Sequence, residues 1–266
     1  MGTATLLIIA GSDSGGGAGI QADIKTASAR GVYATTAITA ITAQNTRGVQ
    51  EVEVLPPDLV ATQIRSVLED IGADAIKIGM LGSAGIAAAV AGALDGYDGP
   101  VVLDPVMVAK SGDQLLPDDA VAALRDRLLP RASLLTPNLP EAARLLGCDI
   151  ASDRDEVARQ GAALRDLGPR AVLVKGGHGP GPVCRDLLVH EGAPLPLEAP
   201  RRDTANTHGT GCSLAAALAA ELAKGAGLPA AAATAHAWLQ GALAEADTLR
   251  IGHGHGPVHH FHGIWA

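Results

Sequence analysis

The sequence predicts an α/β protein with a mostly parallel central sheet that is covered by helices on both faces. Short apolar runs alternate along the chain with segments in which apolar residues recur about every 3.6 positions. This alternation is typical of βαβ units, and right-handed connections between them produce a doubly wound sandwich. Several apolar runs also end in polar or glycine-rich clusters, at the sheet edge where such proteins bind ligands.

Strands are expected where the apolar runs are short and bounded by turn-forming residues. Five runs meet this description, at residues 6–10, 75–78, 101–103, 133–135 and 171–174. Two further strands, 183–190 and 193–199, flank Glu191 and Gly192 and predict a hairpin. Helices are expected in the periodic segments, at residues 17–30, 59–71, 83–94, 118–128, 140–146, 154–167, 211–224 and 230–247.

Length and composition restrict the class of protein. A chain of 266 residues with 47% hydrophobic residues can bury a large core. No repeat, low-complexity linker or break in composition divides it, so we expect a single domain over residues 1–266. The 20 basic and 28 acidic residues give a net charge of −8, and only two Trp, two Tyr and one Phe are present to stack on bases. Nucleic acid is therefore not an expected partner.

The chain is expected in the cytoplasm. No run reaches 18 consecutive apolar residues, so no membrane span is expected, and the N-terminal apolar run lacks the basic region and cleavage site of a signal peptide. The three cysteines, Cys148, Cys184 and Cys212, are odd in number and widely spaced. This pattern favours free thiols over a disulfide framework or a zinc site.

The strongest functional signal is a turn of small residues within 203–214, directly before an Ala- and Leu-rich helix. The first N–H groups of a helix lack intrahelical partners and carry partial positive charge, and Gly209 and Gly211 leave room for an anion beside them. Cys212 lies in the same field, which we expect to lower its thiol pKa. An ordinary glycine turn, with Cys212 as a small buried residue, is the alternative interpretation.

A second glycine-rich segment, residues 11–19, follows the first predicted strand. It has neither the spacing of a dinucleotide-binding loop nor the Gly-Lys of a P-loop. It is expected to let a small heteroaromatic substrate approach the backbone, with Asp23 and Gln44 supplying an acceptor and a donor. A solvated helix carboxylate and a loop amide are the alternative interpretations of these two residues.

Further polar groups follow other predicted strands. Asp104 ends one strand, where a carboxylate can hold a hydrated Mg²⁺, and Glu141 can do the same through water. Asn138 and Glu141 are also spaced like a helix cap, which is the alternative for this pair. Lys175 directly follows Val-Leu-Val, where its charge can be used against transferring phosphate oxygens; a lysine reaching from the strand end into solvent is the alternative.

Two segments carry weaker signals. Five of the nine histidines lie within residues 252–262, but the glycines between them leave no rigid geometry for a metal. A surface loop or closing segment is expected there. Lys110 and Asp113 are expected on a mobile loop near the cleft.

Six motifs occur in order along almost the whole chain, at residues 10–26, 39–48, 104–112, 136–141, 174–178 and 206–212. Together they resemble the hydroxymethylpyrimidine/phosphomethylpyrimidine kinases of thiamine biosynthesis, in the ribokinase-like superfamily. The resemblance implies a three-layer α/β/α sandwich with about eight strands. It also implies two ATP-dependent steps, which phosphorylate 4-amino-5-hydroxymethyl-2-methylpyrimidine and then its monophosphate.

The resemblance implies catalytic roles at the turn before the long helix. Cys212 would be the general base, where most sugar kinases of the superfamily have Asp. The N–H groups of Gly209, Thr210 and Gly211 would form an anion hole, and Lys175 would contact the transferred phosphate.

The resemblance also implies how the ligands bind. Asp23 and Gln44 would hold the aminopyrimidine, assisted by the backbone of Gly11. Asp104 and Glu141 would surround Mg²⁺, and the remaining contacts to ATP would come from Asp104, Asn138, Lys175, Thr210 and His236. His236 is a departure, because the family more often has Lys at this position.

Two other functions stay open. A pyridoxal or pyridoxine kinase performs the same chemistry on an alcohol of similar shape, and a non-catalytic pyrimidine-binding protein can be built on the same fold. The pairing of Asp23 with Gln44 favours the aminopyrimidine, while Gly-Thr-Gly-Cys with Lys175 and Glu141 favours an enzyme. The family resemblance further suggests a homodimer.

Overall fold

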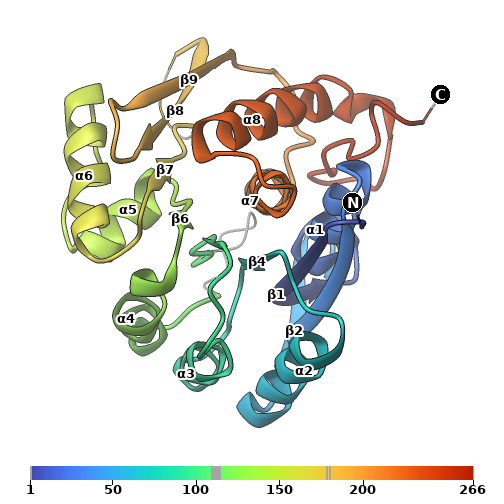
Figure 1. Ribbon diagram of the computed structural model, residues 1–266. Helices are drawn as coiled ribbons and strands as arrows, with labels where there is room; N and C mark the ends of the chain where they lie inside the picture. Colours follow the sequence, from blue (N-terminus) through green and yellow to red (C-terminus); the bar gives the residue numbers. More distant parts are fainter. Residues whose placement is uncertain (1, 109–114, 178, 180, 266) are drawn as a thin grey trace.

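The computed structural model describes residues 2–108, 115–177, 179 and 181–265, in which helices pack on both faces of one sheet (Figure 1). The strands in these residues are β1 (Thr5–Asp13), β2 (Tyr33–Asn45), β3 (Gly48–Val54), β4 (Ala75–Ile78), β5 (Val101–Leu103), β6 (Leu134–Leu135), β7 (Val172–Val174), β8 (Val183–Val189) and β9 (Leu195–Pro200). The helices are α1 (Gly19–Ala29), α2 (Pro57–Asp70), α3 (Ala84–Ala93), α4 (Asp118–Arg127), α5 (Leu139–Leu146), α6 (Arg154–Asp166), α7 (Thr210–Ala223) and α8 (Leu228–Ala244).

The order of the strands brings several strand ends to one edge. The nine-stranded sheet runs β3-β2-β1-β4-β5-β6-β7-β8-β9. The neighbours from β2 to β7 are parallel, whereas β3 at one edge and β8 with β9 at the other are antiparallel. The residues that follow β1, β4, β5, β6 and β7 therefore lie along the same side of the sheet.

Two apolar layers hold the helices against the sheet. Because successive side chains of a strand point to opposite faces, Leu7 and Ile9 of β1 pack into one layer, and Leu6 and Ile8 into the other. The first layer includes buried residues of α2 to α6, and the second includes those of α1, α7 and α8. This arrangement confirms the predicted α/β/α sandwich. None of the described helices is both long enough and apolar enough to cross a membrane.

Most predicted elements are confirmed within a few residues, but β2 and β3 were missed. β2 is rich in Thr and Ala, and Ala has a weak preference for strands. β3 reads Gly-Val-Gln-Glu-Val-Glu-Val and most of it is exposed, so no apolar run marks it as a strand. The sheet thus has nine strands in the described residues, where the resemblance implied about eight.

Two local features position the loops around the site. β1 continues past its apolar run to Asp13, with a shift of register against β2 between Ala10 and Ser12. The C-terminal segment folds back onto the residues before α7, where His208 and Pro257 form an isolated parallel bridge. The first glycine-rich loop, the turn before α7 and the C-terminal segment therefore lie together.

Candidate active site

Helix α7 begins at a glycine whose conformation other residues rarely adopt. Gly209 is the N-cap with φ of 75°, and a Cβ atom there would lie 1.8 Å from the carbonyl oxygen of Gly17. The turn before α7 therefore packs directly on the first glycine-rich loop. Thr210 and Gly211 follow in the first turn of the helix, where backbone N–H groups lack intrahelical acceptors; the N–H of Thr210 donates to the carbonyl oxygen of Thr207, outside the helix, at 3.3 Å. This is the geometry expected of an anion-binding turn.

A lysine and a carboxylate approach this turn from the sheet. Nζ of Lys175, at the end of β7, lies 2.7 Å from Oδ1 of Asp104, which follows β5. A Cβ atom at Gly211 would lie 3.2 Å from that Nζ and 3.7 Å from Oδ2 of Asp104. Burial disfavours the charged lysine, but Asp104 and Glu141 outweigh burial and raise the pKa of Lys175. The structure thus brings a permanent cation to the mouth of α7.

Asn138 and Glu141 form a capping box at the start of α5. Oδ1 of Asn138 accepts from the N–H of Glu141 at 2.8 Å, and Oε2 of Glu141 accepts from the N–H of Asn138 at 2.8 Å. The alternative interpretation of this pair as a cap is therefore confirmed. Glu141 also interacts with Lys175 and Asp104, and burial raises its pKa to about 7 against the opposing charge of Lys175.

The carboxylates near Lys175 fit a hydrated cation better than a closed metal cage. In the part of the chain that the structure describes, no group of three or more His, Cys, Asp or Glu residues is placed to hold a metal ion. Asp104 is close enough to Glu141 for its charge to raise the pKa of Glu141. Mg²⁺ commonly takes one or two carboxylates and keeps several waters, so this pair fits Mg²⁺ bound partly through water.

Asp23 is not a solvated helix carboxylate. Its side chain and that of Lys77 are fully excluded from solvent, and Nζ of Lys77 lies 2.7 Å from Oδ2 of Asp23. Burial raises the pKa of Asp23 to about 6, although Lys77 opposes this shift. Oδ1 of Asp23 is buried and has no hydrogen-bond partner among the described residues. An orphaned buried acceptor of this kind is a group that a ligand can satisfy.

The sequence analysis missed Lys77, although a signal was present. Lys77 lies in the four-residue strand Ala75–Ile78, in which every residue is buried. A lysine inside a fully apolar strand must be paired, because an isolated buried charge is very costly. Its positive charge lies close enough to act on Cys212 as well as on Asp23.

Cys212 lies close to Lys77 and Asp23 but is itself partly exposed, and its thiol is harder to ionise than we expected. Burial raises the pKa of Cys212 to about 11, with the charge of Lys77 acting in the opposite direction. The expected lowering of this pKa by the helix N-terminus is therefore wrong, because the loss of solvation around a thiolate outweighs the favourable charges. The thiol is neutral in the unliganded protein near pH 7.

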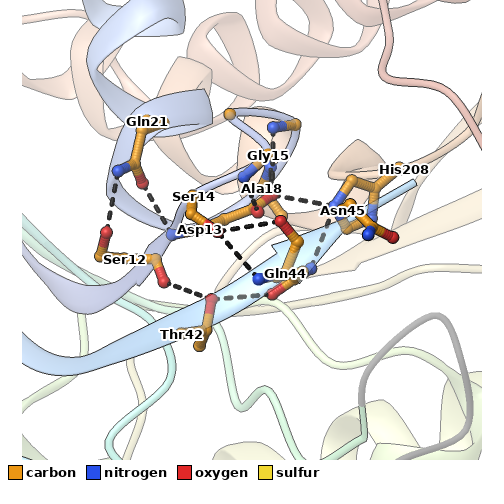
Figure 2. A network of polar contacts seen from close by, with 12 residues as sticks. Ser12, Asp13, Ser14, Gly15, Ala18, Gln21, Thr42, Gln44, Asn45 and His208 are labelled. Carbon is orange, nitrogen blue, oxygen red and sulfur yellow. Dashed lines mark hydrogen bonds and ion pairs between the residues drawn. The ribbon is translucent and has the colours of Figure 1, made fainter. Parts of the chain in front are cut away.

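Gln44 belongs to a polar network that joins β2, the first glycine-rich loop and the turn before α7 (Figure 2). Its Nε2 lies 3.2 Å from Nε2 of His208, which in turn lies 2.9 Å from Oδ2 of Asp13. Gly11 lies nearby, and a Cβ atom there would come within 2.8 Å of Sδ of Met80. Nothing in the sequence distinguished Asp13 or His208 from ordinary loop residues.

His236, in α8, lies close to Asp186 of β8. It is 7% exposed in α8 and interacts with Asp186, whose Oδ1 accepts from the N–H of Gly176 at 2.8 Å. Burial raises the pKa of Asp186, and the charges of His236 and Lys175 oppose this shift. His236 is thus connected to the residue that follows Lys175.

The histidine-rich C-terminal segment, residues 252–262, packs as a strap against other parts of the chain. Its glycines permit close contacts, since a Cβ at Gly254 would lie 2.1 Å from the carbonyl oxygen of Thr46, and one at Gly256 would lie 2.2 Å from Oδ1 of Asn206. These contacts place the segment on the residues after β2 and before α7, and its role as a closing segment stays a prediction. Lys110 and Asp113 lie outside the described residues.

Known proteins are similar to this chain over almost its whole length. The family model for phosphomethylpyrimidine kinase matches residues 13–259. A hydroxymethylpyrimidine/phosphomethylpyrimidine kinase of Rhizobium meliloti is 54% identical over 263 residues, which cover 99% of each chain. The enzyme of the same name from Escherichia coli is 53% identical over 97% of this chain and 98% of its own.

Solved structures of two kinds of vitamin kinase have the same fold. An ADP complex of Bacillus subtilis pyridoxal kinase has a TM-score of 0.90 and 36% identity, covering 97% of this chain and 98% of its own. Phosphomethylpyrimidine kinase from Clostridium difficile has a TM-score of 0.80 and 40% identity, covering 90% of this chain and 98% of its own.

Proposed function

Because this chain belongs to the phosphomethylpyrimidine kinase family and is a hydroxymethylpyrimidine/phosphomethylpyrimidine kinase of thiamine biosynthesis, we propose that both of its phosphoryl transfers occur at the mouth of α7. The γ-phosphoryl group of ATP passes first to the exocyclic CH₂OH of 4-amino-5-hydroxymethyl-2-methylpyrimidine, and then to the resulting monophosphate. The observation that carries this proposal is the meeting of the α7 turn with Lys175, Asp104 and the buried groups close to Cys212.

The pyrimidine is held by Asp23 and Gln44, with the backbone of Gly11 beside them. The unpaired Oδ1 of Asp23 supports this placement, because it can accept a hydrogen bond from the exocyclic amino group. Gln44 offers both a donor and an acceptor from β2. Lys77 keeps the buried carboxylate of Asp23 paired while the substrate enters.

The migrating phosphoryl group is stabilised by the N–H groups of Gly209, Thr210 and Gly211 together with Lys175. Phosphoryl transfer needs positioned positive charge more than covalent chemistry, and the raised pKa of Lys175 keeps its charge at neutral pH. ATP use is supported by structural neighbours that were solved with ADP or AMP-PCP. Asn138 and His236 complete the nucleotide side of the site.

Cys212 acts as the general base in the first transfer. The attacking alcohol must lose a proton, whereas a phosphate monoester is already largely ionised at neutral pH. The raised pKa of Cys212 makes its thiolate a strong base but a rarely populated one. The cation of Lys77 and a hydrogen bond from the backbone N–H of Gly19 both favour this thiolate.

Mg²⁺ is held by Asp104 and Glu141, at least partly through water. When bound, this ion neutralises phosphate oxygens of ATP. Glu141 must be ionised for this role, and the charge of Lys175 favours its ionised form.

A second substrate is supported by the structural neighbours. Pyridoxal kinases with TM-scores of 0.90 and 0.91 share 36% and 32% identity with this chain. We therefore propose that the site also admits pyridoxal, with the aminopyrimidine preferred because of Asp23 and Gln44.

One assay set tests these assignments. ADP release is measured with the pyrimidine, its monophosphate and pyridoxal, each as the sole acceptor, and kcat/KM is compared for the two alcohols. We expect turnover with both pyrimidines and a lower kcat/KM with pyridoxal. A higher kcat/KM for pyridoxal would reverse the assigned preference. Turnover of the pyrimidine without turnover of its monophosphate would show that only the first transfer occurs at this site.

We further propose that the chain forms a single domain and assembles as a homodimer. A single domain is supported by one sheet that contains strands from Thr5 to Pro200 and by a family match over residues 13–259. A homodimer is supported by apolar side chains exposed on β2 and β3, namely Ile41, Val52 and Val54. Light scattering during gel filtration measures the molar mass in solution, and we expect twice the mass of one chain. A cytoplasmic location stays a prediction.

A further inference from the structure

The network around Gln44 contains a conflict between hydrogen-bond donors that points to a role for His208 (Figure 2). The carboxylate of Asp13 caps the first glycine-rich loop: Oδ1 accepts from the N–H of Gly15 at 2.8 Å, and Oδ2 accepts from the N–H groups of Gly17 at 3.0 Å and Ala18 at 2.7 Å. Nε2 of His208 lies 2.9 Å from the same Oδ2. Both oxygens of this carboxylate therefore accept hydrogen bonds from neighbouring donors.

This environment decides which nitrogen of His208 carries a proton. Although burial alone would raise it, the hydrogen bonds from His208 and the loop amides lower the pKa of Asp13, so the carboxylate is ionised and can only accept. Nε2 of His208 must therefore carry a hydrogen and donate it, because the other tautomer would place a lone pair 2.9 Å from a negative oxygen. A protonated ring nitrogen cannot accept a hydrogen bond.

The amide of Gln44 is consequently the group that must adapt. With Nε2 of Gln44 facing Nε2 of His208 at 3.2 Å, two donors face each other. The contact with Thr42 is also mismatched. The hydroxyl of Thr42 has one proton, which it donates to the carbonyl oxygen of Ser12 at 2.8 Å. Oε1 of Gln44 lies 3.2 Å from the same hydroxyl oxygen, so two acceptors face each other there. A half-turn of the amide removes both mismatches, because Oε1 then becomes the second acceptor, beside Asp13, of the Nε2–H of His208, and Nε2 donates to Thr42.

We propose that His208 is a positioning residue that selects this half-turned orientation of Gln44 and thereby sets the substrate specificity of the kinase. The inference rests on the proposed contact between Gln44 and the pyrimidine. After the half-turn, one lone pair of Oε1 and one N–H of Nε2 remain for a ligand, in a fixed order. An aminopyrimidine presents a ring-nitrogen acceptor beside an amino donor, whereas its 4-oxo analogue presents a ring N–H beside an oxygen acceptor. The order set by His208 fits the first and opposes the second.

The surroundings of His208 hold its ring in place. A Cβ atom at Gly17 would lie 2.4 Å from Cδ2 of His208, so the ring packs closely against that glycine. The backbone of His208 donates to the carbonyl oxygen of Gly256 at 3.0 Å and accepts from the N–H of Val258 at 3.4 Å. The C-terminal strap therefore fixes His208 directly before Gly209, which links the orientation of the substrate contact to the phosphoryl-binding turn.

The test compares kcat/KM for the aminopyrimidine and its 4-oxo analogue in three proteins. His208→Phe keeps an aromatic ring but removes the donor, and we expect the amino-to-oxo ratio to fall by about tenfold, the usual worth of one well-placed hydrogen bond of about 1.4 kcal/mol. His208→Gln returns a donor at a similar reach and should restore most of the ratio. KM for ATP should stay unchanged in both variants. An unchanged ratio in His208→Phe, or an equal loss for both pyrimidines with a raised KM for ATP, would overturn the proposal.

Two further variants separate this inference from the proposed function. Thr42→Val removes the acceptor for Nε2 of Gln44 without touching His208, so it should also lower the ratio, and it serves if His208→Phe does not fold. Gln44→Ala should abolish the discrimination between the two pyrimidines. If Gln44→Ala leaves kcat/KM unchanged, the proposed substrate contact is wrong. If Gln44→Ala impairs the reaction while both His208→Phe and Thr42→Val keep the wild-type ratio, only the positioning role is wrong.

Discussion

Nζ of Lys77 lies 2.7 Å from Oδ2 of Asp23, and neither side chain is exposed to solvent. The pair joins the middle of the sheet, at β4, to helix α1. The same ammonium favours the thiolate of Cys212, so one buried cation serves the substrate contact and the proposed base. Such a pair is costly to desolvate, and this cost is expected at a functional site rather than in a core built for stability.

Replacing Lys77 should destabilise the protein strongly. In Lys77→Met the carboxylate of Asp23 loses its partner inside the core, and we expect a loss of about 3–5 kcal/mol in the free energy of unfolding. Urea unfolding at pH 7 measures this loss. The double variant Lys77→Met with Asp23→Leu removes both charges and should recover much of the stability. A single variant as stable as the wild type would contradict a paired, dry Lys77.

Removing the thiol of Cys212 should affect the two transfers unequally. We expect Cys212→Ala to slow phosphorylation of the alcohol by about 100-fold or more, and to spare phosphorylation of the monophosphate, which needs no base. Separate assays that start from each acceptor measure the two rates. Cys148→Ala is the control, because that thiol is exposed and lies outside the site. Equal losses in both steps would remove Cys212 from the role of base.

Removing the charge of Lys175 should slow both transfers. Each transition state carries the same migrating phosphoryl charge, so Lys175→Ala should lower both rates by about 100-fold, in the range known for single electrostatic donors. Lys224→Ala is a suitable control, since Lys224 lies at the far end of α7. Full activity of Lys175→Ala would place the phosphate elsewhere.

Acid should destabilise the protein through His260. This side chain is 4% exposed, and its Nε2 lies 3.0 Å from Oγ of Ser213 in the first turn of α7. Burial, reinforced by the nearby charge of Lys25, lowers the pKa of His260 to about 3 from its ordinary value of 6.5. Between these two pH values the imidazole is protonated in the unfolded chain but not in the folded protein. The contribution of His260 to the free energy of unfolding is therefore fully present above pH 6.5 and is lost as the pH falls toward 3.

Between pH 6 and 4, His260 should make the free energy of unfolding fall by up to about 1.4 kcal/mol for each pH unit. Urea unfolding over this range should show a flatter dependence in His260→Gln. His253→Gln, at an exposed position of the same segment, should keep the wild-type slope. Identical slopes in all three proteins would show that His260 is not kept neutral by folding.

The C-terminal strap should not tolerate a side chain at Gly254. A Cβ there would lie 2.1 Å from the carbonyl oxygen of Thr46, two residues from Gln44, so Gly254→Ala must displace backbone. We expect a loss of about 1–3 kcal/mol in stability and a raised KM for the pyrimidine. Gly263→Ala is the matched control, because nothing lies within 4 Å of its Cβ position. Wild-type behaviour of Gly254→Ala would mean that the strap does not pack on Thr46.

The sequence by itself determined the elements whose signals are local. The spacing of apolar residues predicted the helices and the buried strands. Contiguous motifs placed Asp104 and Lys175 directly after strands, and the turn of Gly209 to Cys212 at the start of a helix. β2 and β3 escaped because their stability comes from pairing with neighbours rather than from an apolar run of their own.

Only the tertiary structure decided the pairings between distant residues. Lys77 meets Asp23 across 54 positions, and His208 meets Asp13 across 195. The raised pKa of Cys212 likewise depends on how completely other segments remove water from it. Periodic patterns report the geometry of one element, whereas burial and long-range hydrogen bonds depend on which elements become neighbours. For this reason the sequence could predict an anion-binding turn before α7. It could not predict the protonation state of Cys212 or the contact between His208 and Asp13.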